Sequence, residues 1–279
     1  MITIKSAREI ETMRRSGKIT SKTLGMLMRV ARPGMTTLEL DRLAEESIRS
    51  LGGIPTFVGY QGYPSTICAS VNDEVVHGMP GPRVLRDGDL LSIDIGTTLD
   101  GYVSDSAVTI PIGNVSAAAS RLMRVTQESL MLGIARMQAG NRLSDIGHTV
   151  QKHAESHGYG VVRELVGHGI GTKMHEEPQV PNYGPPGQGP SLRIGLVLAI
   201  EPMITEGGYQ VRTLRDGWTV VTADGKLAAH FEHTIAITED GPRILTLRDI
   251  GEHEDVERYR PKEEIAALNA PTGGVTLTR

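Results

Sequence analysis

The sequence predicts an α+β domain made of two similar halves, each with two helices over a bent antiparallel sheet. The first reason is a repeat, because Leu85–Asp94 (LRDGDLLSID) aligns with Leu192–Glu201 (LRIGLVLAIE) at a constant offset of 107 positions. The second reason is that two helical patterns precede each copy. The glycines that end these helices recur at an offset of 106 positions, with Gly34 and Gly52 matching Gly140 and Gly158.

The first half begins with two helices that carry clear start and stop signals. Ser6–Ala31 has apolar residues at helical spacing, and Ser6 forms a capping box with Glu9. A second helix starts at Thr36, with Glu39 three residues later, and stops at Gly52. Both therefore read as amphipathic helices that cover one face of a sheet.

The remaining elements follow from short apolar runs, glycines and prolines. Thr56–Val76 predicts irregular strands, and Ser116–Gln138 and Ser144–His157 predict the second helix pair. Pro178–Pro190 is rich in Pro and Gly and predicts a loop. Further strands are predicted over Leu192–Glu201, Gly208–Val211, Trp218–Val221 and His230–Ile237.

Two acids stand inside an apolar strand pattern in the stretch Leu91–Ser106. The pattern predicts a hairpin with its turn over Thr97–Gly101, which would let Asp94 and Asp105 meet on one face. No Lys or Arg occurs between Asp89 and Pro111. A buried carboxylate needs a compensating positive charge, so a metal ion is expected here. The alternative is a pair of solvated acids on an edge strand.

The bulk properties favour a globular cytoplasmic protein. A net charge of −4 with mixed signs gives no basic field for nucleic acid and no polybasic patch for a membrane. The single Cys68 excludes an intrachain disulfide framework, and no apolar run reaches the roughly 18 residues that span a bilayer. We expect one catalytic domain over residues 1–250 and a flexible tail over 251–279.

Three further residues extend the set of candidate metal ligands. His168 lies between glycines in VGHGIG, Glu201 is the repeat partner of Asp94, and Glu232 lies in the strand pattern HFEHTIAI. With Asp94 and Asp105 they form an oxygen-rich set with one nitrogen. Such a set suits two divalent ions with bridging carboxylates, and fits Mn, Fe, Co or Zn.

Three rival constellations are weaker. His153 and His157 stand at i and i+4 on a helix, but Glu155 is not next to His153 as a metalloprotease HExxH helix requires, so a solvated helix face is expected. Cys68 has no activating base nearby and reads as a buried thiol. The glycines of Gly184–Gly189 lack the lysine of a phosphate loop.

Several motifs together resemble the type I methionine aminopeptidases of the pita-bread fold. They are HGMPG, SIDIGTTLDGYVSDSAVT, VGHGIG with MHEEP, AIEPM and FEHTIAIT, and the resemblance runs from Ile4 to Asp249. It implies two pseudo-symmetric halves with the antiparallel sheet inside and the helices outside. Two positions depart from the pattern expected of bacterial relatives: Phe57 stands where Cys is frequent, and Met174 where Phe is common.

The resemblance also implies a role for each site residue. Asp105 and Glu232 would bridge two metal ions, Asp94 would complete one site, and His168 and Glu201 the other. Glu201 would also take the proton of the attacking metal-held water, and His77 and His175 would face the substrate. The methionine pocket would be formed by Tyr60, Tyr63, Cys68 and Trp218, together with the two departing positions Phe57 and Met174.

The implied activity is removal of the initiator methionine from nascent polypeptides when the second residue is small. The resemblance further implies a monomer that meets its substrates near the ribosome. The alternatives are an Xaa-Pro-type dipeptidase and a non-catalytic binding protein on the same fold. All five ligand positions are filled, which favours an enzyme.

Overall fold

The computed structural model describes residues 1–248, so the predicted tail over 251–279 lies outside the described residues. Four helices and fifteen strands are described, with one short 3-10 helix at Tyr60–Gly62. The helices are α1 (Ala7–Val30), α2 (Thr37–Ser50), α3 (Ala117–Ala135) and α4 (Ser144–Ser156). The strands of the first half are β1 (Ile54–Pro55), β2 (Ile67–Val71), β3 (Glu74–Val76), β4 (Leu90–Leu99) and β5 (Tyr102–Pro111).

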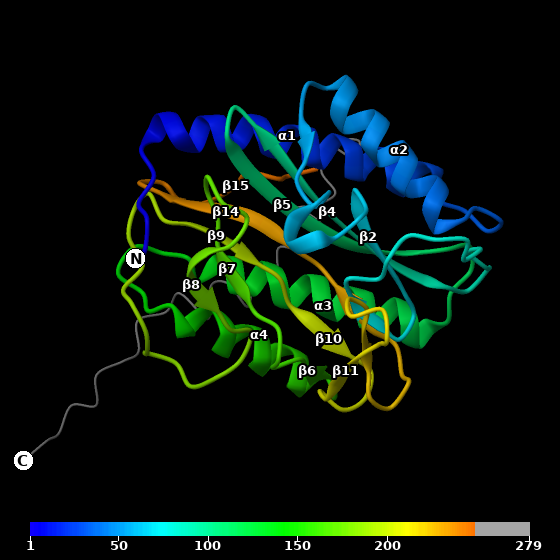
Figure 1. Cartoon of the computed structure of the whole chain (residues 1–279). Coiled ribbons are helices and arrows are strands. Elements are labelled where there is room, and N and C mark those ends of the chain that lie inside the picture. The colour runs from blue at the N-terminus through cyan, green and yellow to red at the C-terminus, as the bar shows by residue number, and fades with distance from the viewer. Residues whose placement is uncertain (249–279) are drawn as a thin grey trace, which may run out of the picture.

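The second half supplies the other strands. They are β6 (Gly160–Val161), β7 (Gly167–Gly169), β8 (Glu176–Val180), β9 (Val197–Ile200), β10 (Met203–Thr205), β11 (Val211–Thr213), β12 (Val220–Thr222), β13 (Ala228–His230), β14 (His233–Thr238) and β15 (Gly241–Ile244). Every pairing between these strands is antiparallel. Figure 1 shows the strands between the helix pair α1 and α2 and the helix pair α3 and α4. This is the predicted α+β pita-bread architecture.

The helix starts agree with the sequence signals. Ser6 and Thr36 are the N-caps of α1 and α2, and each forms a complete capping box, with Glu9 and Glu39. Each capping box satisfies two backbone N–H groups that the helix itself leaves without a partner. The local sequence therefore sets where these two outer helices begin.

The internal repeat is visible in the backbone. Strands β4 and β9 begin at Leu90 and Val197, which are 107 positions apart like the aligned sequence segments. The matched glycines adopt the left-handed conformation that favours glycine: φ is 91° at Gly34 and 96° at Gly140, and 83° at Gly52 and 84° at Gly158. The same turns therefore connect the helices and strands in both halves.

Several strand predictions were wrong in their bounds. The predicted strand His230–Ile237 is two strands, β13 and β14, and Glu232 lies between them. The predicted strand Leu192–Glu201 is reduced to β9, which ends one residue before Glu201. The predicted loop Pro178–Pro190 begins inside β8. In the first two cases a candidate ligand, Glu232 or Glu201, lies just outside a strand, where the backbone leaves the regular ladder.

None of the helices within residues 1–248 is both long enough and apolar enough to cross a membrane.

Candidate metal centre

The β4–β5 hairpin sets Asp94 and Asp105 on the same face of the sheet. In its register Asp94 is opposite Ala107, and Asp105 is opposite Gly96, so the two acids are diagonal neighbours. The pairing continues to Leu99 and Tyr102, which makes the turn shorter than the predicted Thr97–Gly101. Positive φ at Asp100 (50°) and Gly101 (80°) closes this two-residue turn.

Hydrogen bonds between β5 and the chain around β14 bring Asp105 next to Glu232. The Thr234 hydroxyl accepts from the Asp105 N–H at 2.9 Å and donates to the Asp105 carbonyl at 2.8 Å. The Ser106 hydroxyl donates to the Glu232 carbonyl at 2.7 Å, and the Glu232 N–H donates to the Ala107 carbonyl at 2.9 Å. One acid of each half is thereby fixed at the junction of the two sheets.

His168 on β7 completes a group of possible ligands. One ligand atom each of Asp105, His168 and Glu232 lies within 4.8 Å of the others, and all three residues are buried. His168 Nε2 is 3.9 Å from Asp105 Oδ2 and 3.5 Å from Glu201 Oε1. Its Nδ1 lies 2.9 Å from the Gly169 carbonyl, which can only accept, so Nδ1 carries the proton and Nε2 faces the acids. Neither glycine beside His168 leaves space for a larger residue, because a side chain at Gly167 would meet the Ala199 carbonyl and one at Gly169 the Glu177 carbonyl.

The electrostatics of the site are those of acids without a counter-charge. Burial raises the pKa of Asp94 from 3.8 to about 7, and burial together with the charges of neighbouring acids raises the pKa of Asp105, Glu201 and Glu232 well above the usual range. Burial, and next the proximity of His175, lowers the pKa of His168 from 6.5 to about 4. The imidazole is therefore neutral, as a metal ligand must be.

Unpaired oxygen atoms indicate what this site is built to hold. Asp94 Oδ1, Asp105 Oδ1 and Glu232 Oε1 are buried and lack a hydrogen-bond partner among the described residues. Buried polar atoms are nearly always paired, and a divalent cation would satisfy all three. Carboxylate oxygens with one imidazole are a donor set that first-row divalent ions accept. The residues therefore fit a divalent metal, and their assignment as ligands remains a prediction.

Two further histidines lie beside this group. The His175 ring packs against the His168 ring at 4.2 Å between centroids, and the Tyr60 hydroxyl lies 2.6 Å from His175 Nδ1. Burial lowers the pKa of His175, and burial followed by the proximity of His175 lowers the pKa of His77. Both imidazoles are therefore expected to be neutral at pH 7. His77 follows β3 and has a positive φ of 58°.

The residues predicted for the methionine pocket belong to one apolar cluster. Phe57, Tyr63, Cys68 and Met174 are buried in it, and Tyr60 and Trp218 pack against it. The Tyr63 ring meets Trp218 edge-on at 5.1 Å and Phe57 at 6.4 Å. Cys68 pairs with Asp94 across β2 and β4, which connects this cluster to the acids. Cys68 is buried, as predicted, and burial raises the pKa of its thiol, which opposes a nucleophilic role.

Sequence reasoning gave no role to two residues beside Glu201. His230 Nε2 is 3.9 Å from Glu201 Oε2, and neither His230 ring nitrogen has a hydrogen-bond partner among the described residues. Asn182 Nδ2 donates to the Glu201 carbonyl at 3.1 Å. The only sequence signal for a role of His230 was its position two residues before Glu232. In a continuous strand the two side chains would lie on one face, but the chain breaks between β13 and β14, so that spacing was not informative.

The expected solvated helix face at His153 and His157 is wrong. The His153 side chain is only 13% exposed and contacts Glu128 of α3. Glu155, the acid considered with them in the sequence, is exposed and pairs with Arg163 at 3.9 Å.

Residues 11–239 match the model of metallopeptidase family M24. The methionine aminopeptidase of Clostridium acetobutylicum is 55% identical over 248 residues, which cover 88% of this chain and 99% of that protein. Methionine aminopeptidase 1 of Bacillus subtilis is 54% identical over 246 residues, with 88% and 99% covered. Relatives of this length and identity align with nearly the whole described chain.

Solved structures agree with the sequence matches. The methionine aminopeptidase of Thermotoga maritima has a TM-score of 0.87 and 46% identity, with 88% of this chain and 99% of that chain covered. The prolidase of Pyrococcus furiosus has a TM-score of 0.73 at 22% identity, with 88% of this chain and 66% of that chain covered. At that identity the prolidase shows a shared fold only.

Proposed function

The chain belongs to metallopeptidase family M24, within it to the methionine aminopeptidases, and we propose that it removes the first methionine of new proteins by means of two divalent cations. The proposed ligands lie at the junction of the halves. They are the buried Asp105, His168 and Glu232 and the partly buried Asp94 and Glu201. The observation that carries the proposal is the set of buried carboxylate oxygens without hydrogen-bond partners. When bound, the two cations supply a water of lowered pKa and a positive site for the free amino group of the substrate.

The protein's own groups would supply proton transfer and orientation. Glu201 would accept a proton from the attacking water, because a carboxylate can act as a general base, and it lies among the proposed ligands, 3.5 Å from His168. With the Tyr60 hydroxyl donating to Nδ1, His175 carries its proton on Nε2 and donates it to the developing oxyanion of the substrate. His77 faces the amide nitrogen of the bond that is cleaved.

The apolar cluster would bind the methionine side chain. Tyr63 and Trp218 meet edge-on there, and Met174 and Cys68 add polarisable sulfur. A flexible thioether suits such surroundings. Binding the free amino group at the cations would limit cleavage to the first residue, and a small second residue is the expected preference.

A peptide panel tests this function against its alternatives. We expect cleavage of Met-Ala-Ser but not of Ala-Pro or Gly-Pro peptides, with activity abolished by a chelator and restored by Mn²⁺, Co²⁺ or Fe²⁺. Turnover that survives prolonged chelation would contradict the metal mechanism. Cleavage of Ala-Pro alone would indicate a prolyl dipeptidase, and no cleavage by the metal-loaded protein would indicate a binding protein.

From the resemblance we further propose a cytoplasmic monomer that meets its substrates at the ribosome. Sedimentation of the protein alone tests whether it is a monomer. Co-sedimentation with ribosomes at low and high salt tests whether it binds them.

A further inference from the structure

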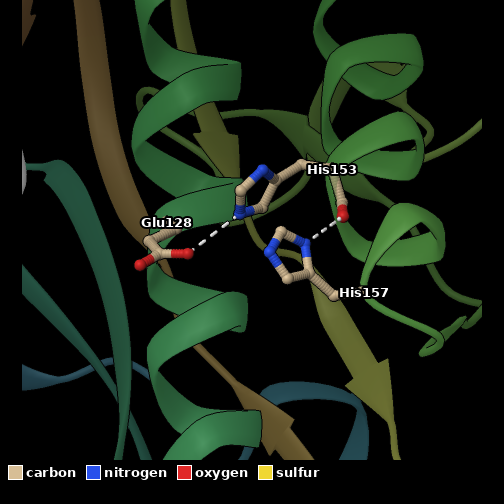
Figure 2. A group of neighbouring side chains, drawn as sticks. All are labelled: Glu128, His153 and His157. Carbon is tan, nitrogen blue, oxygen red and sulfur yellow. Dashed lines mark hydrogen bonds and ion pairs between the residues drawn. The ribbon is translucent and has the colours of Figure 1, made fainter. Parts of the chain in front are cut away.

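A second group of metal-ligating side chains lies on the α3–α4 helix pair. Glu128 comes from α3, His153 lies in the last turn of α4, and His157 directly follows that helix at an i, i+4 spacing (Figure 2). One ligand atom from each residue lies within 4.8 Å of the others. Glu128 is 25 positions from His153, so the group exists only because the two helices pack together. We call these residues the α3–α4 cluster.

The ring nitrogens of the cluster are directed by hydrogen bonds. His157 Nδ1 lies 2.8 Å from the His153 carbonyl, which can only accept, so Nδ1 carries the proton. The lone pair is then on Nε2, and Figure 2 shows this nitrogen turned toward the space between Glu128 and His153. His153 Nε2 is 3.0 Å from Glu128 Oε2 in the same space. A metal-ligating histidine is commonly oriented in this way, through its second nitrogen.

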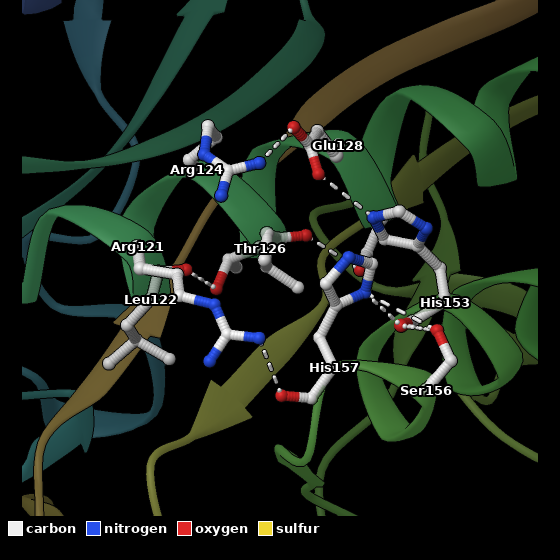
Figure 3. A network of polar contacts seen from close by, with 10 residues as sticks. Arg121, Leu122, Arg124, Thr126, Glu128, His153, Ser156 and His157 are labelled. Carbon is white, nitrogen blue, oxygen red and sulfur yellow. Dashed lines mark hydrogen bonds and ion pairs between the residues drawn. The ribbon is translucent and has the colours of Figure 1, made fainter. Parts of the chain in front are cut away.

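Two arginines of α3 hold the cluster from outside (Figure 3). Arg124 Nη1 donates to Glu128 Oε1 at 2.9 Å, which leaves Oε2 for the histidines. Arg121 Nη2 donates to the His157 carbonyl at 3.1 Å and fixes the end of α4. The Arg124 side chain is 50% exposed, so water screens its charge from a cation in the cluster.

We propose that Glu128, His153 and His157 bind a borderline divalent ion, of which zinc is the best example, and that this ion joins α3 to α4. Two imidazoles and one carboxylate are a donor set that Zn²⁺ accepts in tetrahedral geometry, with water as the fourth ligand. Bonds of about 2.0–2.1 Å separate tetrahedral ligand atoms by about 3.3 Å, close to the 3.0 Å between His153 and Glu128. The ligand atom of His157 lies within 4.8 Å of the other two.

This site is separate from the proposed catalytic ions, with which it shares no ligand. The competing interpretation is a plain ion pair between protonated His153 and Glu128, with His157 as a bystander that caps α4. The two interpretations differ at His157, because only a metal site needs its Nε2.

The test counts zinc on the full-length protein at saturation, by dialysis and metal analysis of the wild type and of three variants. We expect Glu128→Gln and His157→Gln each to bind one zinc fewer than the wild type. The matched control is His148→Gln, which changes the other α4 histidine, whose Nδ1 lies 3.1 Å from the Gly184 carbonyl. The control should bind as much zinc as the wild type.

The readout is the difference between variants, so it does not depend on how many ions the catalytic centre holds. Methionine cleavage by each variant, measured beside the zinc count, shows that the variant is folded, because none of these residues belongs to the proposed catalytic group. Extended X-ray absorption at the zinc edge adds a second measurement, in which the imidazole signal should fall in His157→Gln. An unchanged zinc count in either cluster variant, or an equal loss in His148→Gln, would overturn the proposal.

Discussion

Burial raises the pKa of the four carboxylates of the candidate metal centre, and for Asp105, Glu201 and Glu232 the charges of neighbouring acids raise it further. Among the neighbouring charges, that of Glu232 has the largest effect on the pKa of Asp105. The charge of Asp105 has the largest effect on the pKa of Glu201. Only an opposite charge among them reverses this effect, since like charges close together disfavour ionisation. Each ionised acid alone would lower the stability of the folded protein. Together the acids form a site with a strong preference for cations.

The proposed bridging acids should be indispensable for metal binding. Asp105→Ala or Glu232→Ala is expected to lose both ions and at least about 100-fold in activity, since even the loss of a group behind the ligands costs 10–100-fold. Asp100→Ala is the control, because this acid of the same hairpin lies at the turn and pairs with the exposed Arg15 at 3.0 Å. Metal analysis of the purified variants decides the outcome. Two ions retained in Asp105→Ala would show that the bridging assignment is wrong.

The metal-free protein should lose stability as the pH rises. Burial raises the folded-state pKa of Asp94 to about 7, and burial with the charge of Glu232 raises that of Asp105 well above its usual range. The folded state therefore binds more protons than the unfolded state, so this contribution is present below about pH 4 and disappears as the pH rises toward 7 and above. Urea unfolding of chelated protein at pH 5 and pH 8 measures it, and Asp105→Asn should reduce the difference. A chelated protein more stable at pH 8 than at pH 5 would contradict this account.

At the scale of single elements, α1 contains two glycines with different surroundings. A side chain at Gly17 would meet the backbone carbonyl of Leu245, whereas one at Gly25 would meet only the flexible end of Arg29. Gly17→Ala is therefore expected to destabilise the protein by about 1–3 kcal/mol. Gly25→Ala should stabilise it by up to about 1 kcal/mol through helix propensity. Chemical denaturation measures the free energy of unfolding of the two variants. Equal changes in both would show that the close approach at Gly17 does not matter for stability.

Helix starts and turns were predictable because their signals are local. Ser6 with Glu9, and Thr36 with Glu39, satisfy backbone groups within four residues of one another. The break between β13 and β14 was not predictable, because it follows from hydrogen bonds of Glu232 to a strand of the other half. The apolar pattern of one segment does not show which residues of another strand will bond to it.

At the scale of the whole molecule, Thr234 joins the halves by two hydrogen bonds to one residue. Thr234→Val removes both bonds to Asp105. We expect a loss of about 1–3 kcal/mol in stability and metal binding weakened by about 10–100-fold. The control is Thr238→Val on the same strand. Its hydroxyl donates to the Gly241 carbonyl at 2.8 Å and accepts from the Asp240 N–H at 3.2 Å, so both of its bonds are local. Unfolding and metal titration of both variants test this, and equal losses of metal affinity would contradict it.

The candidate metal centre could be predicted from sequence, whereas the α3–α4 cluster could not. Asp94 and Glu201 occupy matching positions of the repeat, so symmetry indicated that they face each other. Glu128 has no such partner in the repeat. It reaches His153 only through the packing of two helices, and neither helix pattern fixes which of their residues meet.

The link between Asp105 and Thr234 spans 129 residues of chain. A contact of such long sequence separation closes only after both halves have largely acquired their own structure, because the entropy of closing a long loop must be overcome first. The proposed cations would therefore not guide the early collapse of the chain. Bound after assembly, they would slow the unfolding of the native protein.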